Sequence, residues 1–346
     1  MLHPAKRNKV LLKISILVLL SFVLFWIDLS LGSAQISFPR LLSLLFSPDL
    51  HSSEWFTVHV FRLPRVLTAV FVGIALSVSG LQMQTVFRNP LAGPYVLGIS
   101  SGASLGVALV VLGFSGYFAG NVFFLSGSWL LVTAAWLGSA LVLFIILMVS
   151  FRVRDIMTLL ILGIMFASGI SAIISILQYF SGESALKAFV IWTMGSVSNV
   201  SREQIPVILT GIIPGLLIAL LVVKSSNAIQ LGESHAKTLG INIIRYRTLV
   251  FVSTSLLTGT VTAFCGPIGF IGIAVPHICR MIFQTSRQGI LLISSVFAGA
   301  SVMLISDIVS QLPGSESILP INAVTSLLGI PVVIWIIFRK QKLIAA

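Results

Sequence analysis

Long apolar segments recur along the whole chain, and short polar segments separate them. Each apolar segment approaches or exceeds the roughly 18 to 20 residues that cross about 30 Å of hydrocarbon as an α-helix. They predict ten membrane spans, centred on residues 10–30, 64–86, 91–112, 121–150, 156–180, 204–224, 246–265, 267–284, 289–311 and 319–338. The pattern is typical of an all-α polytopic membrane protein. We expect one transmembrane domain over residues 1–346, because no gap between spans is long enough for a separate soluble domain.

Composition and charge agree with this pattern. Apolar residues make up 57% and charged residues 9% of the chain, against about 45–50% and about 25% in soluble domains. The net charge of +12 would suggest a nucleic-acid partner in a soluble protein, but its distribution favours a membrane. If both termini are cytoplasmic, the positive-inside rule is obeyed. Only five of the 21 Lys and Arg residues then lie outside, namely Arg40, Arg62, Arg65, Lys187 and Arg202.

The first span has an alternative interpretation. Residues 6–30 could be a cleaved signal peptide, with a basic start and with Gly32-Ser33-Ala34 as a small-residue cleavage site. The apolar run is long for a signal peptide, so we favour a permanent span. The orientation of the later spans is the same in both cases.

Two stretches rich in glycine and proline interrupt the apolar pattern at corresponding places. One covers residues 89–94 and the other covers residues 265–272. Interrupted spans at matched positions in two halves of a chain are typical of transporters built from internal repeats. Close helix packing through small residues is the alternative explanation.

Two polar segments are too short to span a membrane but have helical periodicity. Residues 184–200 predict a short helix at the outer interface. Residues 225–242 contain a compact helix bounded by glycines, in which Glu233 and Lys237 have the i, i+4 spacing of an ion pair. This second segment is the longest cytoplasmic loop, so we expect a cytoplasmic partner to bind there.

Six short motifs carry a resemblance that covers nearly the whole chain. They are Arg62-Leu63-Pro64-Arg65, Gly80-Leu81-Gln82-Met83-Gln84 with Asn89-Pro90-Leu91-Ala92, Trp192-Thr193-Met194-Gly195-Ser196, Leu231-Gly232-Glu233 through Leu239-Gly240, Gly266-Pro267-Ile268-Gly269-Phe270-Ile271-Gly272 with Pro276-His277, and Leu319-Pro320-Ile321 through Gly329-Ile330-Pro331. In this order and spacing they resemble the FecCD family of iron-siderophore, haem and cobalamin permeases. These are the membrane subunits of type II ABC importers.

The resemblance implies a permease in the bacterial inner membrane, with cytoplasmic N- and C-termini, that imports an iron(III)-siderophore or a related chelate such as haem or cobalamin. It also implies a homodimer, two cytoplasmic ABC ATPases and an extracytoplasmic substrate-binding protein. The residues agree that ATP is hydrolysed by another chain. Lys224-Ser225 and Lys237-Thr238 lack the glycine that precedes the lysine of a phosphate-binding loop. We therefore expect no cofactor on this chain and no enzymatic activity, with ATP and Mg²⁺ used by the partner.

Small and neutral polar residues follow one face of the fifth and tenth spans, which resemble the walls of the family's translocation path. The residues are Gly163, Ala167, Ser171, Ser175, Gln178, Asn322, Ser326 and Gly329. An uncharged, weakly polar wall suits a bulky chelate that must pass without binding tightly. Helix packing through the same small residues is the alternative.

The resemblance assigns roles to three further groups. Arg62 and Arg65 resemble arginines that receive acidic residues of the binding protein, with interfacial snorkelling as the alternative. Gln311 stands where a further arginine is often found. The cytoplasmic gate region corresponds to Asn89, Pro90, Leu91, Ile156 and Met157. The segment that couples to the ATPase corresponds to Leu231, Gly232, Glu233, His235, Lys237, Leu239 and Gly240.

Other chemistry has weaker support in the sequence. Asp307 is embedded in a late span, where a structural hydrogen bond or ion pair competes with a substrate role. A permease for bare metal ions would need His, Cys, Asp or Glu gathered inside the membrane, but these residues are scattered and we expect no metal site. An intramembrane hydrolase would use Ser100 in Gly98-Ile99-Ser100-Ser101-Gly102, but that motif needs a strand before the serine.

Overall fold

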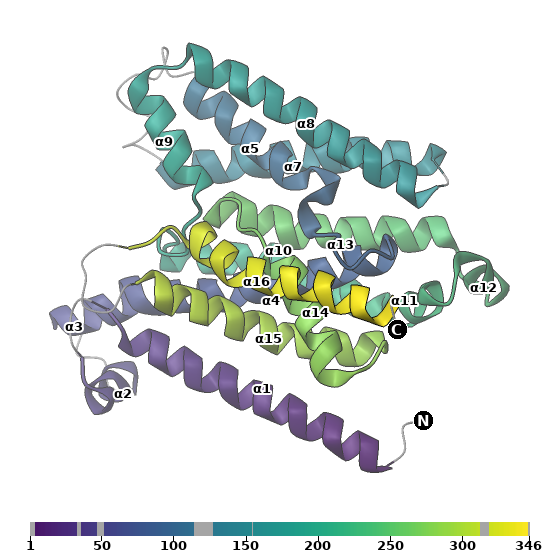
Figure 1. Ribbon diagram of the computed structural model, residues 1–346. Coiled ribbons are helices and arrows are strands. Elements are labelled where there is room, and N and C mark those ends of the chain that lie inside the picture. The colour runs from purple at the N-terminus through teal and green to yellow at the C-terminus, as the bar shows by residue number, and fades with distance from the viewer. Residues whose placement is uncertain are drawn as a thin grey trace.

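Figure 1 shows the computed structural model of the chain, which is a bundle of helices. The structure describes residues 4–32, 36–46, 52–113, 127–153, 155–311 and 318–344. Within these residues, seven helices are long and apolar enough to cross a membrane: α1 (Pro4–Ser30), α4 (Leu63–Val86), α7 (Gly127–Arg152), α8 (Ile156–Phe180), α10 (Ile205–Leu221), α13 (Ile243–Cys265) and α15 (Gln288–Ser310). Three shorter helices are also apolar: α5 (Ile99–Ala108), α14 (Ile271–Phe283) and α16 (Ile321–Ile344).

Short helices connect or flank the apolar ones. They are α2 (Phe38–Phe46), α3 (Ser53–Phe56), α9 (Glu183–Thr193), α11 (Val223–Gln230) and α12 (Glu233–Thr238). A π-helical turn, Thr57–Arg62, joins α3 to α4, and a second one, Leu109–Gly113, follows α5. Thus α9 begins one residue before the polar segment 184–200 and covers its first part, and α12 lies within the polar segment 225–242.

The apolar helices coincide with the predicted spans, so the all-α membrane fold is confirmed. Two spans are shorter than predicted, because helix begins only at Ile99 and at Ile271, after the glycine- and proline-rich turns. Residues 121–126 of the fourth predicted span lie outside the described residues. So do Ser33 and Ala34 of the alternative cleavage site.

The first helix is integrated into the bundle through α15. Ser21 Oγ lies 2.8 Å from Ser301 Oγ and 2.9 Å from the carbonyl oxygen of Phe297. In the N-terminal half of α1, Lys13 Nζ donates to the Ile282 carbonyl at 2.6 Å. These contacts join α1 to distant parts of the chain, and the permanent first span stays a prediction.

The central helix is α4, which packs against α13, α14 and α15. A Cβ added to Gly73 would overlap the carbonyl group of Gly299 on α15, and a Cβ added to Gly80 would overlap that of Gly272 on α14. Such close approach is typical of helices in lipid, where packing through small residues replaces the missing hydrophobic driving force. The glycines of α4 therefore determine how near its neighbours lie.

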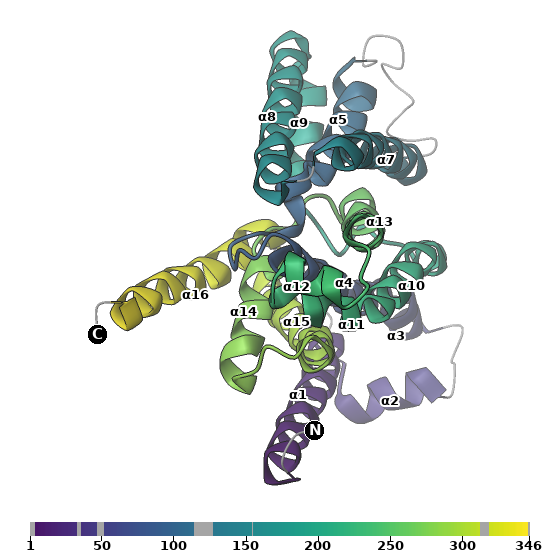
Figure 2. The same cartoon turned by 90° about the vertical axis from the view of Figure 1, so that its right-hand side faces the viewer.

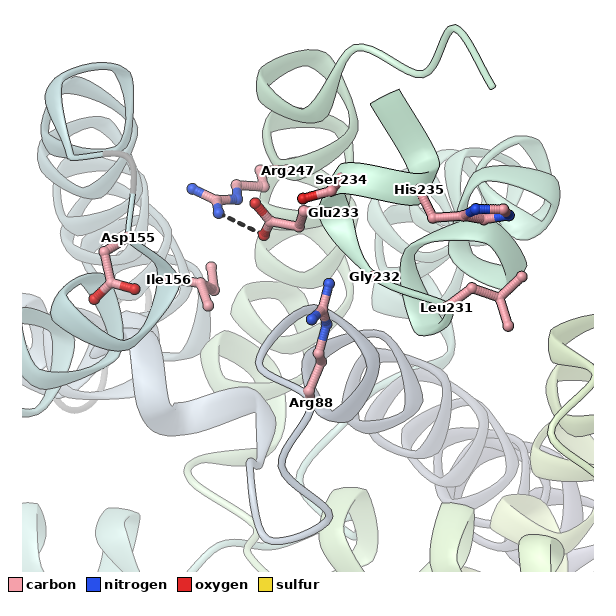
Figure 3. Close-up of a pocket in the computed structure, with 9 residues that line it drawn as sticks. All are labelled: Arg88, Asp155, Ile156, Leu231, Gly232, Glu233, Ser234, His235 and Arg247. Atoms are coloured by element: carbon pink, nitrogen blue, oxygen red, sulfur yellow. Dashed lines mark hydrogen bonds and ion pairs between the residues drawn. The ribbon is translucent and has the colours of Figure 1, made fainter. Parts of the chain in front are cut away.

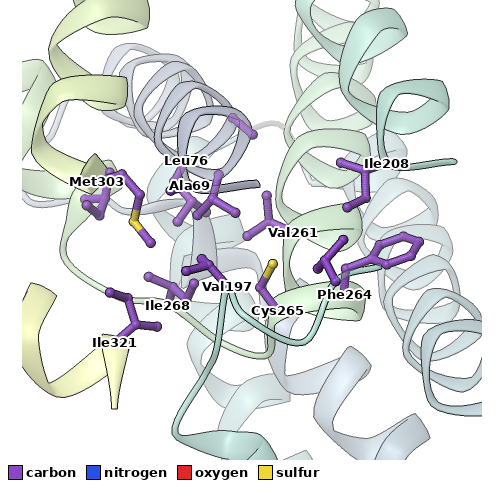
Figure 4. Packing of buried hydrophobic residues seen from close by; sticks show 14 of the residues in the cluster. Ala69, Leu76, Val197, Ile208, Val261, Phe264, Cys265, Ile268, Met303 and Ile321 are labelled. Carbon is purple, nitrogen blue, oxygen red and sulfur yellow. The ribbon is translucent and has the colours of Figure 1, made fainter. Parts of the chain in front are cut away.

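Figure 4 shows the apolar core where these helices converge. Its labelled residues are Ala69, Leu76, Val197, Ile208, Val261, Phe264, Cys265, Ile268, Met303 and Ile321. Polar groups inside the bundle bond to one another, as Gln82 Oε1 accepts from Ser253 Oγ at 3.1 Å and from Thr254 Oγ1 at 3.3 Å. Unpaired polar groups are costly in an apolar medium, so these bonds favour one rotation of α13 against α4.

The two interrupted segments meet inside the bundle. The Tyr95 hydroxyl donates to the Ile268 carbonyl and accepts from the Ile268 N–H at 3.2 Å. One phenol thus pairs both backbone groups of a residue that lies between helices, where they would otherwise lack partners. Gly98 and Gly266 have φ values of 73° and 72° at the ends of these turns, a conformation that favours glycine.

The central helices are flanked on one side by a group of four helices and on the opposite side by α1 (Figures 1 and 2). In both views α5, α7, α8 and α9 lie together on one side, and α1 lies on the opposite side beside α15. The N-terminal end of α1, the C-terminal end of α16 and the short helix α12 lie at one end of the bundle in Figure 1, whereas α2, α3 and α9 lie at the other.

Candidate coupling site and translocation path

A pocket of about 510 Å³ opens at the end of the bundle that carries α12. The end of α4, the start of α8, α12 and α13 surround it (Figure 3). The residues around it are Arg88, Asp155, Ile156, Leu231, Gly232, Glu233, Ser234, His235 and Arg247. Two guanidinium groups and two carboxylates are among them, so their formal charges balance.

The helix α12 is set between two glycines with unusual backbone angles. Gly232 precedes it with a φ of 123°, and Gly240 follows it with a φ of 78°. No atom lies within 4 Å of a Cβ built on either residue, so backbone conformation rather than space favours glycine here. Ala236 is fully buried on the inner side of α12 and packs it against the bundle.

Two leucines next to α12 are largely exposed. Leu231 is 71% and Leu239 is 59% exposed, and they lie on either side of the helix in the chain. Figure 3 shows Leu231 at the rim of the pocket. Exposed apolar side chains grouped around a polar helix are typical of a surface that another protein covers.

Glu233 at the start of α12 is held by α13. Its Oε1 accepts from Arg247 Nη2 at 2.7 Å, and the Arg247 side chain is only 6% exposed (Figure 3). The predicted ion pair between Glu233 and Lys237 is therefore wrong. A buried guanidinium needs a carboxylate partner more than an exposed ammonium does, and Lys237 is exposed.

The predicted gate residues lie at or next to this pocket. Asn89 Oδ1 accepts from the Leu91 N–H at 2.9 Å and closes the turn that contains Pro90 after α4. Ile156 lines the pocket at the start of α8, and Met157 next to it is exposed. Ile156 is thus the one predicted gate residue among those that line the pocket, and Asn89 follows the lining residue Arg88 in the chain. The gating role of these residues stays a prediction.

The start of α8 is capped by Asp155. Its Oδ2 accepts from the backbone N–H and from the hydroxyl of Thr158, each at 2.7 Å. These hydrogen bonds lower the pKa of Asp155, and the positive charge of Arg247 adds to the effect. Asp155 is therefore a carboxylate at neutral pH, across the pocket from Arg247.

The predicted path residues on α8 divide into two sets. Gly163 is buried, since a Cβ there would lie 2.6 Å from the Val96 carbonyl oxygen, and Ala167 lies near the turn before α5. These five residues form a stripe along α8, which reaches accessible surface at Ser171, Ser175 and Gln178. A spacing of four residues drifts about 40° per step around a helix with 3.6 residues per turn. The start of the stripe therefore packs, and its end faces outward.

On α16 the predicted path residues contact the interrupted segment before α14. Asn322 Oδ1 accepts from the Gly269 N–H at 3.0 Å, and a Cβ on Gly329 would lie 2.6 Å from Phe270 Cβ. Ser326 Oγ donates to the Asn322 carbonyl at 2.6 Å. These contacts are packing contacts, so lining of a path by α16 stays a prediction.

The family model of the FecCD transport family matches residues 18–339 of the chain. The chain belongs to this family. It is 33% identical over 332 residues to the hemin transport system permease protein HmuU of Yersinia pestis, with 96% of each chain covered. It is 36% identical over 280 residues to the vitamin B12 import system permease protein BtuC of Klebsiella pneumoniae, covering 81% of this chain and 82% of BtuC.

The three-dimensional likeness supports the same family. A solved structure, described as an inward-facing conformation of an ABC transporter assigned to the metal-chelate type, matches with a TM-score of 0.79 at 29% identity. The match covers 94% of this chain and 98% of that one. The FecCD chain is thus a multi-pass membrane permease and is not itself catalytic.

The arginines predicted to dock a binding protein contact this permease's own groups. Arg62 is 7% exposed, and its Nη1 donates to the carbonyls of Leu29 and Ser30, at 3.3 and 2.9 Å, where α1 ends. Arg65 is bound to Asp307. Docking on these two residues stays a prediction. The predicted outer cations that are exposed are Arg40, Lys187 and Arg202.

Arg65 forms part of a buried polar cluster in the permease. Its Nε and Nη2 donate to the two oxygens of Asp307, each at 2.8 Å, and the Asp307 side chain has no exposed surface. Asp307 thus forms an ion pair, which was one of the alternatives that the sequence left open. Gln311 Nε2 donates to Asp28 Oδ1 at 2.7 Å. Sequence reasoning missed Asp28, although an acid in an apolar span signals an internal partner.

The alternative functions have little support in the permease structure. Ser100 is buried in the first turn of α5, and a short 3₁₀ turn, Pro94–Leu97, stands where a nucleophile elbow needs a strand. Within the part of the chain that the structure describes, no group of three His, Cys, Asp or Glu residues is placed to hold a metal ion.

Proposed function

We propose that this permease works in an ATP-driven importer and that α12, with Leu231 and Leu239, is the surface that a cytoplasmic ABC ATPase binds. The observation that carries the proposal is the exposure of both leucines around a short helix outside the apolar spans. The helix α12 lies at the end of the bundle where α1 begins and α16 ends (Figure 1). The partner ATPase uses ATP and Mg²⁺, and this chain supplies the route through the membrane.

The proposal fixes an orientation. The end with α12 and both termini is cytoplasmic, and the end with α2, α3 and α9 faces outward in a bacterial inner membrane. The excess of Lys and Arg in the loops on the α12 side supports this direction. An extracytoplasmic binding protein delivers the cargo at the outer end, and two copies of the chain enclose the path between them.

The proposed cargo is an iron(III)-siderophore or a related chelate such as haem or cobalamin. The names of HmuU and BtuC specify hemin and vitamin B12, both bulky organic complexes of a metal. The accessible serines of α8 suit such a cargo. The hydroxyls of Ser171 and Ser175 bond to carbonyls four residues earlier, at 2.9 and 3.0 Å. They therefore present a polar but satisfied surface, which a chelate passes without strong binding.

The test replaces both exposed leucines in one variant, Leu231→Asp with Leu239→Asp. We expect the ATPase that copurifies with the permease to bind at least about tenfold more weakly, because two apolar contacts at an interface are lost and charges are placed there. Uptake of labelled iron(III)-siderophore, haem or cobalamin by cells should fall to the same extent. The cargo whose uptake depends on the wild-type permease identifies the substrate.

A matched control separates this effect from general damage. Ile318 is 57% exposed at the other end of the bundle, just before α16, so Ile318→Asp should leave ATPase binding unchanged. Wild-type ATPase affinity in the double leucine variant would contradict the proposed coupling surface.

A further inference from the structure

Arg247 lies between two acidic residues that belong to different helices. On one side Glu233 of α12 accepts from its Nη2 at 2.7 Å. On the other side Asp155, the N-cap of α8, lies across the same pocket (Figure 3). A guanidinium carries five N–H donors in a planar fork and can serve two carboxylates. Arg247 is therefore placed to interact with both helices.

The base of Arg247 is firmly anchored. Its helix α13 packs against α4, α7 and α10. The neighbouring Tyr246 is buried, and its hydroxyl lies 3.1 Å from Ser226 Oγ of α11. Arg247 itself is buried as well. Its guanidinium therefore extends from a fixed point, and changes at the pocket arise from the elements on either side.

The helix α12 is attached less firmly than α13. It is one short segment bounded by Gly232 and Gly240, and four of its six residues are exposed: Ser234, His235, Lys237 and Thr238. Its inner contacts include the buried Ala236 and the ion pair of Glu233. A protein that closes on Leu231 and Leu239 would therefore displace α12 more easily than α13.

Arg88 completes the set of charges at the pocket. It follows α4 with a φ of 48°, which is unusual for a residue other than glycine. In Figure 3 its guanidinium points toward Glu233 and Ser234. Glu233 is partly exposed and has this second cation nearby, so Arg247 can change partner without leaving Glu233 unpaired.

We infer that Arg247 is a positioning residue that links the coupling helix to the start of α8. Glu233 holds Arg247 in the arrangement seen here, and displacement of α12 moves the guanidinium toward Asp155, so that the start of α8 follows α12. The inference rests on the proposed function, because the ATPase is what displaces α12. A bound partner can shift an equilibrium only if the two states differ in their contacts. Here the two states differ in whether Arg247 pairs with Glu233 or with Asp155.

Two substitutions at Asp155 separate its charge from its capping role. Asn is as good an N-cap as Asp but has no charge, whereas Glu keeps the charge and is a poor N-cap. Asp155→Asn should therefore interrupt the link while preserving the cap of α8. Asp155→Glu should preserve the link.

The readout is the movement of α8 in the complex of permease and copurified ATPase. Spin labels on Met165→Cys of α8 and Leu217→Cys of α10 occupy exposed positions, and the chain's own Cys265 and Cys279 are buried. The distance between the labels is measured before and after addition of ATP with vanadate. We expect a change in the wild type and in Asp155→Glu, and less than half of that change in Asp155→Asn.

A second variant tests whether Asp155 and Arg247 act together. Arg247→Gln should reduce the α8 response as Asp155→Asn does, and the double variant should show no further reduction, because interacting residues are not additive. Independent, additive losses would overturn the inference. So would a full response in Asp155→Asn with loss in Asp155→Glu, or a wild-type complex in which α8 does not respond.

ATPase binding is measured in parallel and separates the two proposals. If the single variants bind the ATPase with wild-type affinity and only the α8 response changes, the link is supported. If the wild-type permease binds no ATPase, the proposed coupling function fails. If it binds the ATPase and Asp155→Asn responds fully, the coupling function stands and the link through Arg247 is refuted.

Discussion

At the scale of single residues, buried polar and charged groups join α1, α4 and α15 at the ends that lie away from α12. Arg65 donates to both oxygens of Asp307, and Gln311 bridges Asp307 and Asp28 at 3.4 and 2.7 Å. Carboxylates inside a membrane protein are expensive unless they are paired. The guanidinium of Arg65 therefore offsets part of the free-energy cost of burying this acidic cluster.

Removal of that guanidinium should be strongly destabilising. Arg65→Met leaves Asp307 buried without its counter-ion, so we expect a loss of about 3 to 5 kcal/mol in the free energy of unfolding, measured by denaturant titration in detergent. Arg65→Met with Asp307→Leu removes both charges and should recover a large part of the loss. A double variant as unstable as Arg65→Met alone would show that the ion pair is not the cause.

The same residues show why side-chain partners were hard to predict. The embedded acid Asp307 signalled an internal partner, but Arg65 lies 242 positions away in the chain, and hydropathy does not reveal which helix faces it. Glu233 has a plausible partner at Lys237 by spacing and binds Arg247 instead. Local spacing describes the isolated helix, whereas burial of Arg247 decides the pairing in the folded protein.

At the scale of helices, α4 and α14 are in contact through their backbones. Gly80 faces the carbonyl group of Gly272, and Gly272 in turn lies close to Pro94 of the turn before α5. Three elements therefore meet where there is no room for side chains. The position of the interrupted spans depends on this contact.

A pair of glycine substitutions tests the contact. Gly80→Ala places a methyl group against the backbone of Gly272, which cannot yield as a side chain can, so we expect a loss of about 1 to 3 kcal/mol or more in stability. Gly169→Ala on α8 is the matched control, because no atom lies within 4 Å of its Cβ. Alanine favours the helix by about 1 kcal/mol over glycine, so the control should be neutral or slightly stabilising in the same unfolding assay.

The helices themselves were largely predictable, because length and apolarity decide what can cross a membrane. The first residues of two spans were placed too early in the chain. Proline- and glycine-rich turns precede these helices, which begin only at Ile99 and Ile271. The stripe on α8 was found as a pattern, but its division at Ala167 follows from how the helix is rotated against the turn before α5. Rotation of a helix about its axis is a property of packing and is only weakly encoded in hydropathy.

At the scale of the whole molecule, the proposed orientation makes a direct prediction. Lys237→Cys on α12 and Arg202→Cys before α10 both occupy exposed positions at opposite ends of the bundle. A membrane-impermeant maleimide should label the position at residue 202 in intact cells and the position at residue 237 only after the membrane is opened. Labelling of both from one side would contradict the proposed topology.

The bond between Tyr95 and Ile268 has a mechanical consequence for the whole permease. Tyr95 leads into the group of α5, α7, α8 and α9, and Ile268 leads into α14 among the central helices. The bond therefore joins the turn before α5 to the turn before α14. A displacement of either group of helices must carry this contact along or break it.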